Sequence, residues 1–343
     1  MNGKIRAILV GCGGISRTWL EAIHNIPQLE LVGLVDLDLA AAERRASEFS
    51  LSEALLLTDL ELALQKTDPD VVFDCTVPEA HVAVTLAALR HGCHVLGEKP
   101  LADTPEHAKS MVRAAQEAGK TYAVMQNRRF HPQIRRLVSF LRSGAIGAIT
   151  TVHCDFFIGA HFGGFRDHMR HVLLLDMAIH TFDQARLITG SDPLAVYCHE
   201  WNPSGSWYDY DASAVAIFEM TGDIVYTYRG SWCAEGLNTS WESAWRIVGE
   251  RGSVLWDGGD GFSAQVVAEG GSFISEMRDV PLPPSDEHAK VGGHAGLIQD
   301  FVDCIESGRT PETVAHDNIK SLAMVFGAIE SVGRMQRVEI DVA

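Results

Sequence analysis

The sequence has no apolar run long enough to cross a membrane and comparatively few positive charges. A membrane-spanning helix needs about 20 consecutive apolar residues. The apolar start at Ile5–Val10 runs into a glycine turn without the cleavage pattern of a signal peptide. Lysine and arginine number 28 against 45 aspartates and glutamates, a formal net charge of −17. Such a charge repels phosphate backbones and anionic membranes, so we expect no nucleic-acid or membrane partner.

The sequence also lacks the paired cysteines of zinc sites and redox centres. Its seven cysteines are scattered, odd in number and contain no Cys-x-x-Cys pair. Several lie in apolar segments, where a free thiol packs like a small hydrophobic side chain. We therefore expect buried, reduced thiols and a cytoplasmic protein.

At 343 residues the chain is longer than one core of usual size, so two domains are expected. The first third alternates short apolar segments with amphipathic ones. The apolar segments include Ile5–Val10, Leu29–Val35 and Val71–Cys75. Strands that are apolar throughout are buried on both faces, which predicts a doubly wound parallel sheet.

After about residue 126 the pattern changes to longer segments in which polar and apolar residues alternate. These segments are Ile149–Phe157, Ser213–Met220, Ile224–Trp232 and Trp245–Val248. Alternation indicates strands with one solvated face, which favours antiparallel pairing. Amphipathic helices are expected near Leu174–Thr189, Ala295–Ser307 and Asn318–Met335, and a loop or lid over Glu269–Gly293. The sequence thus predicts an α/β protein with a Rossmann domain over 1–125 and an α+β domain over 126–343. The C-terminal helices are candidates for packing back on the first domain.

The segment Gly11-Cys12-Gly13-Gly14-Ile15-Ser16 follows a strand and opens a helix. It matches G-x-G-x-x-G with Ser16 in the third glycine position, the pattern that binds a dinucleotide pyrophosphate at a helix N-terminus. Asp36 closes the second strand. A carboxylate there accepts hydrogen bonds from ribose hydroxyls and repels a 2′-phosphate, so NAD is favoured over NADP.

With Glu98-Lys99-Pro100 after the fifth strand, the sequence resembles the glucose–fructose oxidoreductase/inositol dehydrogenase family, often written Gfo/Idh/MocA. The resemblance covers nearly the whole chain. It rests on residues 11–16, Asp36, residues 76–78 with His81, residues 98–100, residues 127–130 before Pro132, and residues 176–183. It implies a Rossmann domain followed by an α+β domain with a large open, mainly antiparallel sheet. That sheet often mediates homodimers or homotetramers, which we expect here.

The resemblance also implies which residues form the site. The cofactor residues are Gly11, Gly13, Gly14, Ile15, Asp36, Cys75, Thr76, Val77, Pro78, His81, Glu98, Lys99 and Gln126. The substrate residues are Lys99, Asn127, Arg129, Arg166, Asp176 and His180. The chain departs from the family at residues 171–178, where family members often have glycines before the aspartate and where Ala178 replaces a further glycine. This departure indicates a subgroup with its own substrate and leaves the substrate class open.

Oxidation of an alcohol needs a group that takes the hydroxyl proton as the hydride leaves. Lys99 follows the carboxyl end of a predicted parallel strand, where ligands collect in open α/β sheets. Asp176 and His180 are four residues apart on an expected helix and therefore on one face, so the aspartate can orient the imidazole. The resemblance implies that Lys99 and His180 share the proton relay and that Asp176 orients the substrate hydroxyl.

Residues 156–171 are rich in phenylalanine, histidine and glycine, a composition that suits either a polyhydroxylated ligand or a core. His161, His168, His171, Asp176 and His180 also raise the question of a metal. Their spacing matches no known zinc pattern and hydride transfer to NAD requires no metal, so we expect none.

We therefore interpret the chain as an NAD-dependent oxidoreductase acting between nicotinamide and a hydroxyl or carbonyl carbon of a sugar, inositol or related polyol. Two alternatives stay open. One is an enzyme that uses the same redox cycle transiently to eliminate a glycosidic bond. The other is a non-catalytic NAD-sensing protein, which the presence of both Lys99 and His180 disfavours.

Overall fold

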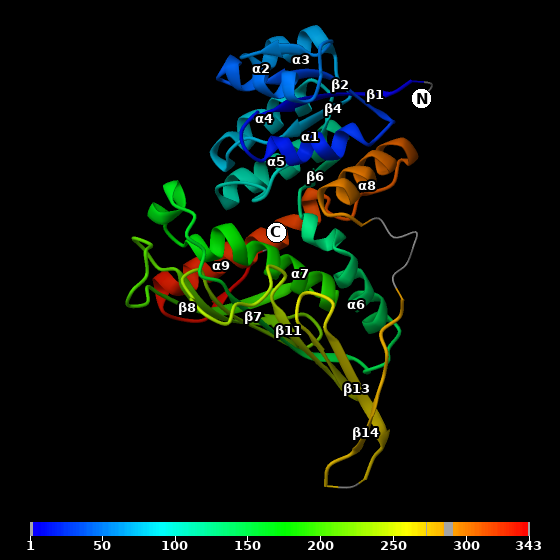
Figure 1. Ribbon diagram of the computed structural model, residues 1–343, viewed down its shortest axis with the longest axis vertical. Coiled ribbons are helices and arrows are strands. Elements are labelled where there is room, and N and C mark those ends of the chain that lie inside the picture. The colour runs from blue at the N-terminus through cyan, green and yellow to red at the C-terminus, as the bar shows by residue number, and fades with distance from the viewer. Residues whose placement is uncertain (1–2, 272, 285–290, 342–343) are drawn as a thin grey trace. The chain divides into compact units, whose positions relative to one another are not determined.

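The computed structural model describes residues 3–271, 273–284 and 291–341. The chain divides into two compact units (Figure 1). The first unit comprises Met1–Phe130 and Lys290–Leu322, and the second comprises His131–Ala289 and Ala323–Ala343. The domain boundary expected from sequence, between residues 125 and 126, stays a prediction.

The first unit contains a six-stranded sheet in the order β3-β2-β1-β4-β5-β6. Its strands are β1 Ile5–Val10, β2 Leu29–Val35, β3 Leu55–Leu57, β4 Val71–Asp74, β5 His94–Gly97 and β6 Tyr122–Val124. Every neighbouring pair is parallel. The strand order reverses between β1 and β4, and such a reversal is where open α/β sheets bind their ligands. The predicted doubly wound parallel sheet is confirmed.

Helices connect these strands, as parallel pairing requires. They are α1 Ser16–His24, α2 Leu39–Glu48, α3 Leu60–Thr67, α4 Pro78–Arg90, α5 Pro105–Ala118, the 3₁₀ helix Asn127–Phe130 and α8 His294–Ser307. Thr104 caps α5, and Pro105 is its first residue. Asp59 caps α3, because its carboxylate accepts a hydrogen bond from the backbone amide of Leu62.

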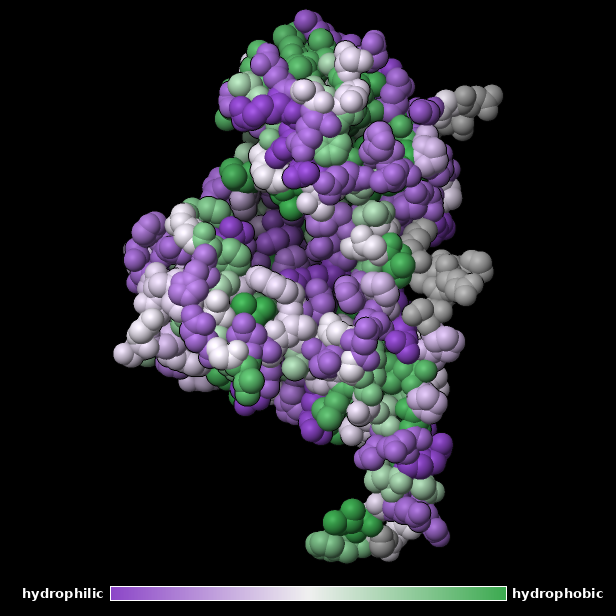
Figure 2. All heavy atoms as spheres, in the orientation of Figure 1, coloured by the Kyte–Doolittle hydropathy of each residue, from purple (hydrophilic) through white to green (hydrophobic). Residues whose placement is uncertain are grey.

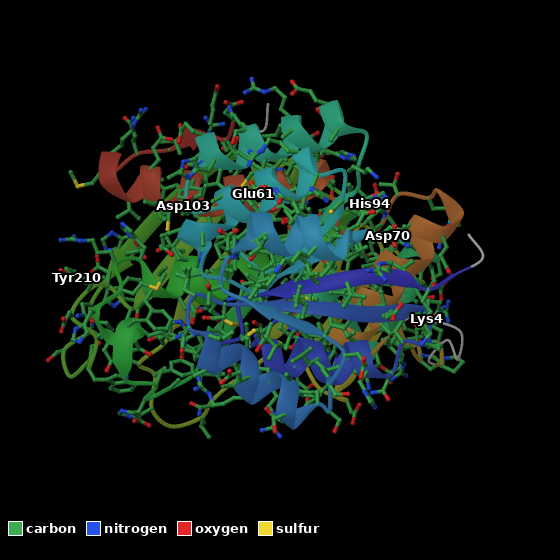
Figure 3. The ribbon with its side chains drawn as sticks, turned by 90° about the horizontal axis from the view of Figure 1, so that it is seen from above. Lys4, Glu61, Asp70, His94, Asp103 and Tyr210 are labelled. Atoms are coloured by element: carbon green, nitrogen blue, oxygen red, sulfur yellow. The ribbon has the colours of Figure 1, made fainter. Side chains whose placement is uncertain are left out.

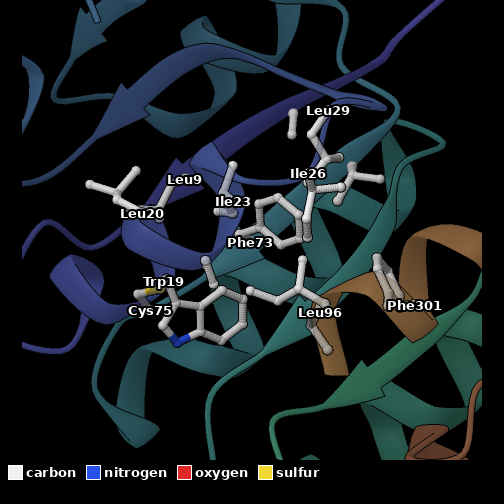
Figure 4. Close-up of a cluster of buried hydrophobic side chains, with 14 of the residues drawn as sticks. Leu9, Trp19, Leu20, Ile23, Ile26, Leu29, Phe73, Cys75, Leu96 and Phe301 are labelled. Carbon is white, nitrogen blue, oxygen red and sulfur yellow. The ribbon is translucent and has the colours of Figure 1, made fainter. Parts of the chain in front are cut away.

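The core of the first unit joins segments that are far apart in the sequence (Figure 4). Trp19 of α1 is fully buried, and its ring lies 5.7 Å from that of Phe73 on β4. Phe73 in turn contacts Phe301 of α8, with ring centroids 6.5 Å apart. Residues near 300 therefore complete the core that supports the first glycine turn.

The two edges of the parallel sheet carry different residues. The amino ends of β1, β4 and β5 carry Lys4, Asp70 and His94. Figure 3 labels these three residues at the same end of the parallel strands. The glycine turn and Lys99 follow the carboxyl ends of β1 and β5. The residues expected to bind the cofactor thus gather at the carboxyl edge.

The second unit contains a nine-stranded sheet in the order β14-β13-β12-β11-β7-β10-β9-β8-β15. The strands are β7 Ile149–Phe157, β8 Pro193–Trp201, β9 Ser213–Met220, β10 Ile224–Ser231, β11 Ala244–Gly249, β12 Gly252–Trp256, β13 Phe262–Glu269, β14 Glu276–Asp279 and β15 Val338–Glu339. The sheet is mainly antiparallel, as predicted, but β7 and β10 pair in parallel. Alternation of polar and apolar residues indicates only that one face of a sheet is solvated. A mixed sheet also has such a face, so the pattern does not reveal the parallel pair.

The helical segments of the second unit are α6 Pro132–Arg142, the 3₁₀ helix Gly164–His168, a π-helix Leu173–Ala178 and α7 Ile179–Thr189. The last helix, α9 Ala315–Arg334, begins in the first unit and ends in the second. Phe182 of α7 is buried and packs edge-on against Phe218 of the sheet at 4.8 Å. Alternate residues on the opposite face of the sheet are exposed, including Tyr197, Ile217 and Val225.

Two local expectations for this unit need correction in part. The helix expected from residue 174 begins as a π-helix, whose i to i+5 pairing adds a residue to the turn. Asp176 and His180 are therefore not on one regular α-helix. The segment expected to be a loop, Glu269–Gly293, contains strand β14, and residues 272 and 285–290 lie outside the described residues. Apolar side chains are exposed near the end of the β13–β14 hairpin (Figure 2). Phe273 and Ile274, between β13 and β14, are both exposed.

All seven cysteines are free thiols, and six of them are buried. The cytoplasmic location inferred from them stays a prediction. Among the helices described in the three ranges above, none is both long and apolar enough to span a membrane.

Gly11 is the position at which the first turn tolerates no side chain. Its φ is +89°, and an added Cβ would lie 2.7 Å from the backbone of Cys75. We expect Gly11→Ala to destabilise the protein by about 1–3 kcal/mol, the usual cost of overpacking. Gly14→Ala is the control, because a Cβ there meets no described atom within 4 Å. Urea unfolding of both variants without cofactor measures the difference, and equal stabilities would contradict this account.

Candidate functional site

The turn between β1 and α1 is held against the neighbouring strands by backbone contacts. The Gly11 amide donates to the carbonyl of Val35 at 2.8 Å. The amide of Cys75, after β4, donates to the carbonyl of Val10 at 2.8 Å. Cys75 is buried, and burial raises the pKa of its thiol. Its contribution to the site is therefore the backbone surface against which Gly11 packs.

Ser16 takes the third glycine position because its hydroxyl is satisfied locally. It is fully buried, and its Oγ donates to the Gly13 carbonyl at 2.7 Å. Arg45 of α2 donates to the same Oγ at 3.0 Å and to the Gly13 carbonyl at 2.8 Å. Arg45 thus fixes the turn from a second helix. No local sequence pattern relates residue 45 to residue 13, so this contact could not be predicted from the sequence.

Asp36 binds the glycine turn from the end of β2. Its two carboxylate oxygens accept the backbone amides of Cys12 at 2.7 Å and of Asp38 at 2.8 Å. An ionised carboxylate offers about four acceptor positions. Asp36 can therefore accept further hydrogen bonds from hydroxyl groups while it holds the turn.

The start of α1 fits a dinucleotide pyrophosphate. Ile15, its N-cap, makes no side-chain cap hydrogen bond, which leaves amide donors of the first turn for an anion. A Cβ added at Gly13 or Gly14 would meet no described atom within 4 Å, so the backbone faces open space. Open glycines, uncapped amides and Asp36 together match what NAD requires.

The loop after β4 is tied to the loop after β5 by a buried histidine. The ring nitrogens of His81 lie 3.0 Å from the Pro100 carbonyl and 3.2 Å from the Thr76 carbonyl, and the side chain is 1% exposed. Thr76 is fixed further by its hydroxyl, which donates to buried Asp74 at 2.5 Å. Val77 is exposed at the start of α4, which Pro78 opens. The two loops are therefore held at a set separation.

Glu98 is a buried carboxylate that directly follows β5 at the carboxyl edge. It accepts hydrogen bonds from the Trp19 indole at 2.6 Å and from the Lys99 backbone amide at 3.0 Å, and His294 Nε2 lies 3.7 Å away. Burial raises the pKa of Glu98, but the hydrogen bonds from His294 and Trp19 and the nearby positive charges outweigh it. The pKa therefore lies below its usual value. Glu98 fixes the backbone of Lys99, whose side chain is half-buried.

His294 is a member of this site that the sequence analysis missed. It opens α8, lies edge-on to Trp19 and has its Nδ1 atom 3.4 Å from the amide nitrogen of Asn127. It therefore contacts both the Glu98 network and a residue expected to bind substrate. A histidine after two glycines late in the chain carries no motif, and only the tertiary fold brings it to this edge.

Two further expected site residues of the first unit are buried in the described structure. Gln126 is 1% exposed, and its backbone amide donates to Val124. Arg129 is 5% exposed, and its guanidinium lies 3.9 Å from Glu312. A ligand role for either residue stays a prediction.

The second unit brings Arg166 and Asp176 together. Arg166 donates to the two Asp176 oxygens at 2.8 and 3.3 Å. Its guanidinium also lies over the rings of Phe162 at 4.9 Å and Phe165 at 4.8 Å. Both rings are exposed, whereas the Asp176 side chain is only 14% exposed. The arrangement presents a clamped carboxylate beside aromatic faces, which suits a polyhydroxylated ligand.

The remaining histidines of the 161–180 segment do not share one ligand position. His161 lies 2.8 Å from Glu235, His168 2.6 Å from Asp209 and His171 2.5 Å from Glu200. His180 is 8% exposed within α7. Lys99 belongs to the first unit and His180 to the second, so their shared proton relay stays a prediction.

Comparison with known proteins agrees with this geometry. Residues 5–126 match the model of the oxidoreductase family with an NAD-binding Rossmann fold, and residues 134–255 match that of the GFO/IDH/MocA C-terminal domain. Inositol 2-dehydrogenase 4 of Saccharopolyspora erythraea is 30% identical over 310 residues, covering 86% of this chain and 88% of the relative. The 1,5-anhydro-D-fructose reductase of Ensifer adhaerens is 24% identical, covering 97% and 98%.

Solved structures share the fold over the whole chain. An oxidoreductase from Agrobacterium radiobacter, in complex with NAD⁺, L-tartaric acid and magnesium, has a TM-score of 0.85 at 21% identity, covering 98% of each chain. A levoglucosan dehydrogenase in complex with NADH and L-sorbose has a TM-score of 0.82 at 20% identity, covering 99% of each chain. With both family domains matched along its length, the chain belongs to the Gfo/Idh/MocA family of NAD-binding oxidoreductases.

Proposed function

We propose that the enzyme transfers a hydride between the nicotinamide of NAD and a hydroxyl or carbonyl carbon of a sugar, an inositol or a related polyol. The observation that carries this proposal is Lys99, whose backbone Glu98 fixes at the carboxyl end of β5, on the same sheet edge as the glycine turn. The relatives named above as an inositol dehydrogenase and an anhydrofructose reductase support the substrate class.

When bound, NAD⁺ supplies the hydride acceptor, and the chain must handle the proton of the hydroxyl group. Lys99 Nζ takes that proton in our proposal, since ligands of open α/β sheets collect at the carboxyl ends of the strands. The half-buried stem of Lys99 limits the positions of its amine, and a restricted amine is a better-placed proton acceptor.

His180 serves as the second member of the relay, and Asp176 orients the substrate hydroxyl. The Arg166–Asp176 pair supports this role, because a carboxylate held by two hydrogen bonds stays ionised and keeps lone pairs for a hydroxyl donor. In this arrangement His180 passes the proton from the substrate side towards solvent. The phenylalanines around Arg166 bind the apolar faces of the sugar ring.

Replacement of the proposed bases tests the proposal directly. We expect Lys99→Ala to lower kcat by about 10²–10⁴, the usual loss on removal of a general acid or base, while NADH affinity changes by no more than a few-fold. His180→Asn should lower kcat and flatten one limb of the pH profile. The assay is NADH formation from NAD⁺ over sugars, sugar acids and inositols, with NADH binding measured by fluorescence.

Lys109→Ala, on α5, is the control for removal of a lysine charge. Near-normal turnover by Lys99→Ala would show that the proton leaves by another route. Turnover of a glycoside without net NADH would favour the transient-redox alternative. NADH binding with no turnover of any compound would favour the NAD-sensing alternative.

Asp36 sets the cofactor preference in our proposal. Its carboxylate opposes a 2′-phosphate and accepts ribose hydroxyls, so we expect tighter binding of NADH than of NADPH. Asp36→Ser should narrow or reverse this preference. Fluorescence titration of both variants with both cofactors measures it. Equal affinity of the wild type for the two cofactors would remove Asp36 from this role.

Glu98 stabilises the fold only while it is ionised. Because its pKa is lowered in the folded protein, its stabilisation is present above the usual glutamate pKa and is lost as the pH falls through the folded value. We expect Glu98→Gln to cost roughly 1–3 kcal/mol at neutral pH and less at acidic pH. Urea unfolding from pH 7 downwards measures this, with exposed Glu43→Gln as control. A pH-independent difference would contradict it.

We propose that the open face of the nine-stranded sheet joins copies of this chain into a homodimer or homotetramer. Tyr197, Ile217 and Thr227 form one row across β8, β9 and β10 on this face, and the first two are exposed apolar side chains. Exposed apolar patches of this kind mark interfaces. The bidentate pair of Arg229 with Asp155 adds a charged contact nearby.

Light scattering after size exclusion tests this interface. We expect the wild type to elute as a dimer or tetramer and Ile217→Arg to dissociate, because a charge would be buried at the centre of the interface. Glu117→Arg on α5, exposed in the first unit, should leave the assembly unchanged. A monomeric wild type would refute the proposal.

A further inference from the structure

We propose that the imidazole of His171, held by the buried carboxylate of Glu200, binds a hydroxyl group of the substrate away from the reacting carbon through its Nε2 atom. The proposal rests on the proposed function and adds a specificity-determining residue to it. Neither residue belongs to the site expected from the family resemblance.

The side chains of His171 and Glu200 lie close together but differ in how deeply they are buried. His171 Nδ1 lies 2.5 Å from Glu200 Oε2, and the His171 side chain is 30% exposed while that of Glu200 is 0% exposed. Glu200 lies near the end of β8, within the sheet. The carboxylate therefore belongs to the rigid interior, and the imidazole extends from it towards the surface.

The hydrogen bond to Glu200 determines which ring nitrogen of His171 carries the proton and which is left for a ligand. With Nδ1 bound to a carboxylate, Nδ1 carries the proton and Nε2 is left to face outward. The hydrogen bond that His171 donates to Glu200 raises the pKa of His171 above its usual value, although burial acts in the opposite direction. Asp211 also favours the charged ring, and Arg170 opposes it. Nε2 can thus accept a hydrogen bond when the ring is neutral and donate one when it is charged.

Among the described residues, the Glu200 carboxylate makes a hydrogen bond with His171 alone. Its Oε1 atom is buried and finds no hydrogen-bond partner among the described residues. A buried carboxylate with one oxygen unpaired is costly to the fold. A costly group that supports a single, half-exposed histidine points to a role for that histidine beyond stability.

The backbone of His171 is also unusual. Its φ is +53°, in the left-handed region that residues other than glycine seldom adopt. Its carbonyl accepts the amide of Leu175 at 2.9 Å, so this residue starts the helical turn that carries Asp176. Strained backbone of this kind concentrates at ligand sites. The same turn thus carries both His171 and the carboxylate expected to orient the substrate.

Residues of the segment 202–212 lie near both His171 and Asp176. Asp211 acts on the charge of His171, and Asp176 is close enough to Tyr208 to contribute to its raised pKa, of which burial is the main cause. Asn202 donates to the Tyr208 carbonyl at 2.8 Å and closes this segment on itself. His171 and Asp176 are therefore placed around one common segment of the second unit.

The neighbouring pair of His168 and Asp209 is a matched contrast. Its atoms are also close, at 2.6 Å, but its side chains are 71% and 57% exposed. An exposed ion pair of this kind contributes little to stability. It lies on the same segment as His171 and therefore serves as the control for loss of a histidine and its carboxylate contact.

Steady-state kinetics of three variants tests the proposal. The substrate is the polyol that the wild type oxidises best in the screen with NAD⁺. We expect His171→Ala to raise KM roughly ten- to a hundred-fold, as loss of a hydrogen bond to a charged group does, with kcat within a few-fold. Glu200→Gln should shift the pH dependence of KM to lower pH, because loss of the carboxylate lowers the pKa of His171. His168→Ala should match the wild type.

Deoxy analogues of the same polyol locate the contact. The wild type should lose affinity for one analogue in particular, and His171→Ala should bind that analogue and the parent polyol equally well, as a double-mutant cycle requires for contacting groups. His171→Asn, which can retain the hydrogen bond to Glu200, provides a folded variant should the alanine variant not fold.

The outcomes separate the inference from the function. Wild-type turnover with unchanged KM and unchanged analogue preference in the His171 variants overturns the inference and leaves the proposed function intact. Lower melting temperatures with an unchanged pH dependence of KM in Glu200→Gln also overturn it, since they show a structural role only. A wild type that oxidises no polyol refutes the proposed function and the inference with it.

Discussion

The buried carboxylate of Glu98 is the anion on which the carboxyl edge of the first sheet depends. It joins Trp19 of α1, the backbone of Lys99 and His294 of α8. The helix proposed to receive the pyrophosphate and the turn that carries the proposed base therefore share one buried acceptor. Because a buried charge must be fully paired, each of these partners constrains the others. The close approach of Gly11 to the strand-end backbone of Cys75 completes the arrangement.

The second unit supplies charged groups held in a different way. Arg166 contacts two phenylalanine rings and donates two hydrogen bonds to Asp176, and Glu200 holds His171 from within the sheet. In each pair one partner is well buried and the other is partly exposed. Fixed polar groups beside aromatic faces are what recognition of several hydroxyl groups needs. The second unit thus combines a rigid sheet with polar side chains that their charged partners hold in place.

Local patterns predicted the first unit well because most residues of its strands are apolar and several of its connections carry a recognisable turn or helix cap. The bounds of β1 and β2 match the predicted segments, and β4 ends one residue before its predicted end. The Arg45 and His294 contacts were missed, since both depend on residues brought together only by tertiary packing. The π-helix at Asp176 was missed for another reason: its extra residue leaves the apolar pattern close to that of an α-helix. Short edge strands such as β14 and β15 carry too few residues to show alternation.

Isotope transfer tests the central claim most directly. The enzyme is incubated with NAD⁺ and a polyol that carries deuterium on its carbinol carbons, and the reduced cofactor is examined by proton NMR. The account predicts one deuterium at C4 of the nicotinamide, on one face only, together with the carbonyl product of the polyol. Reduced cofactor without deuterium, or a polyol left unoxidised across sugars, sugar acids and inositols, would contradict it.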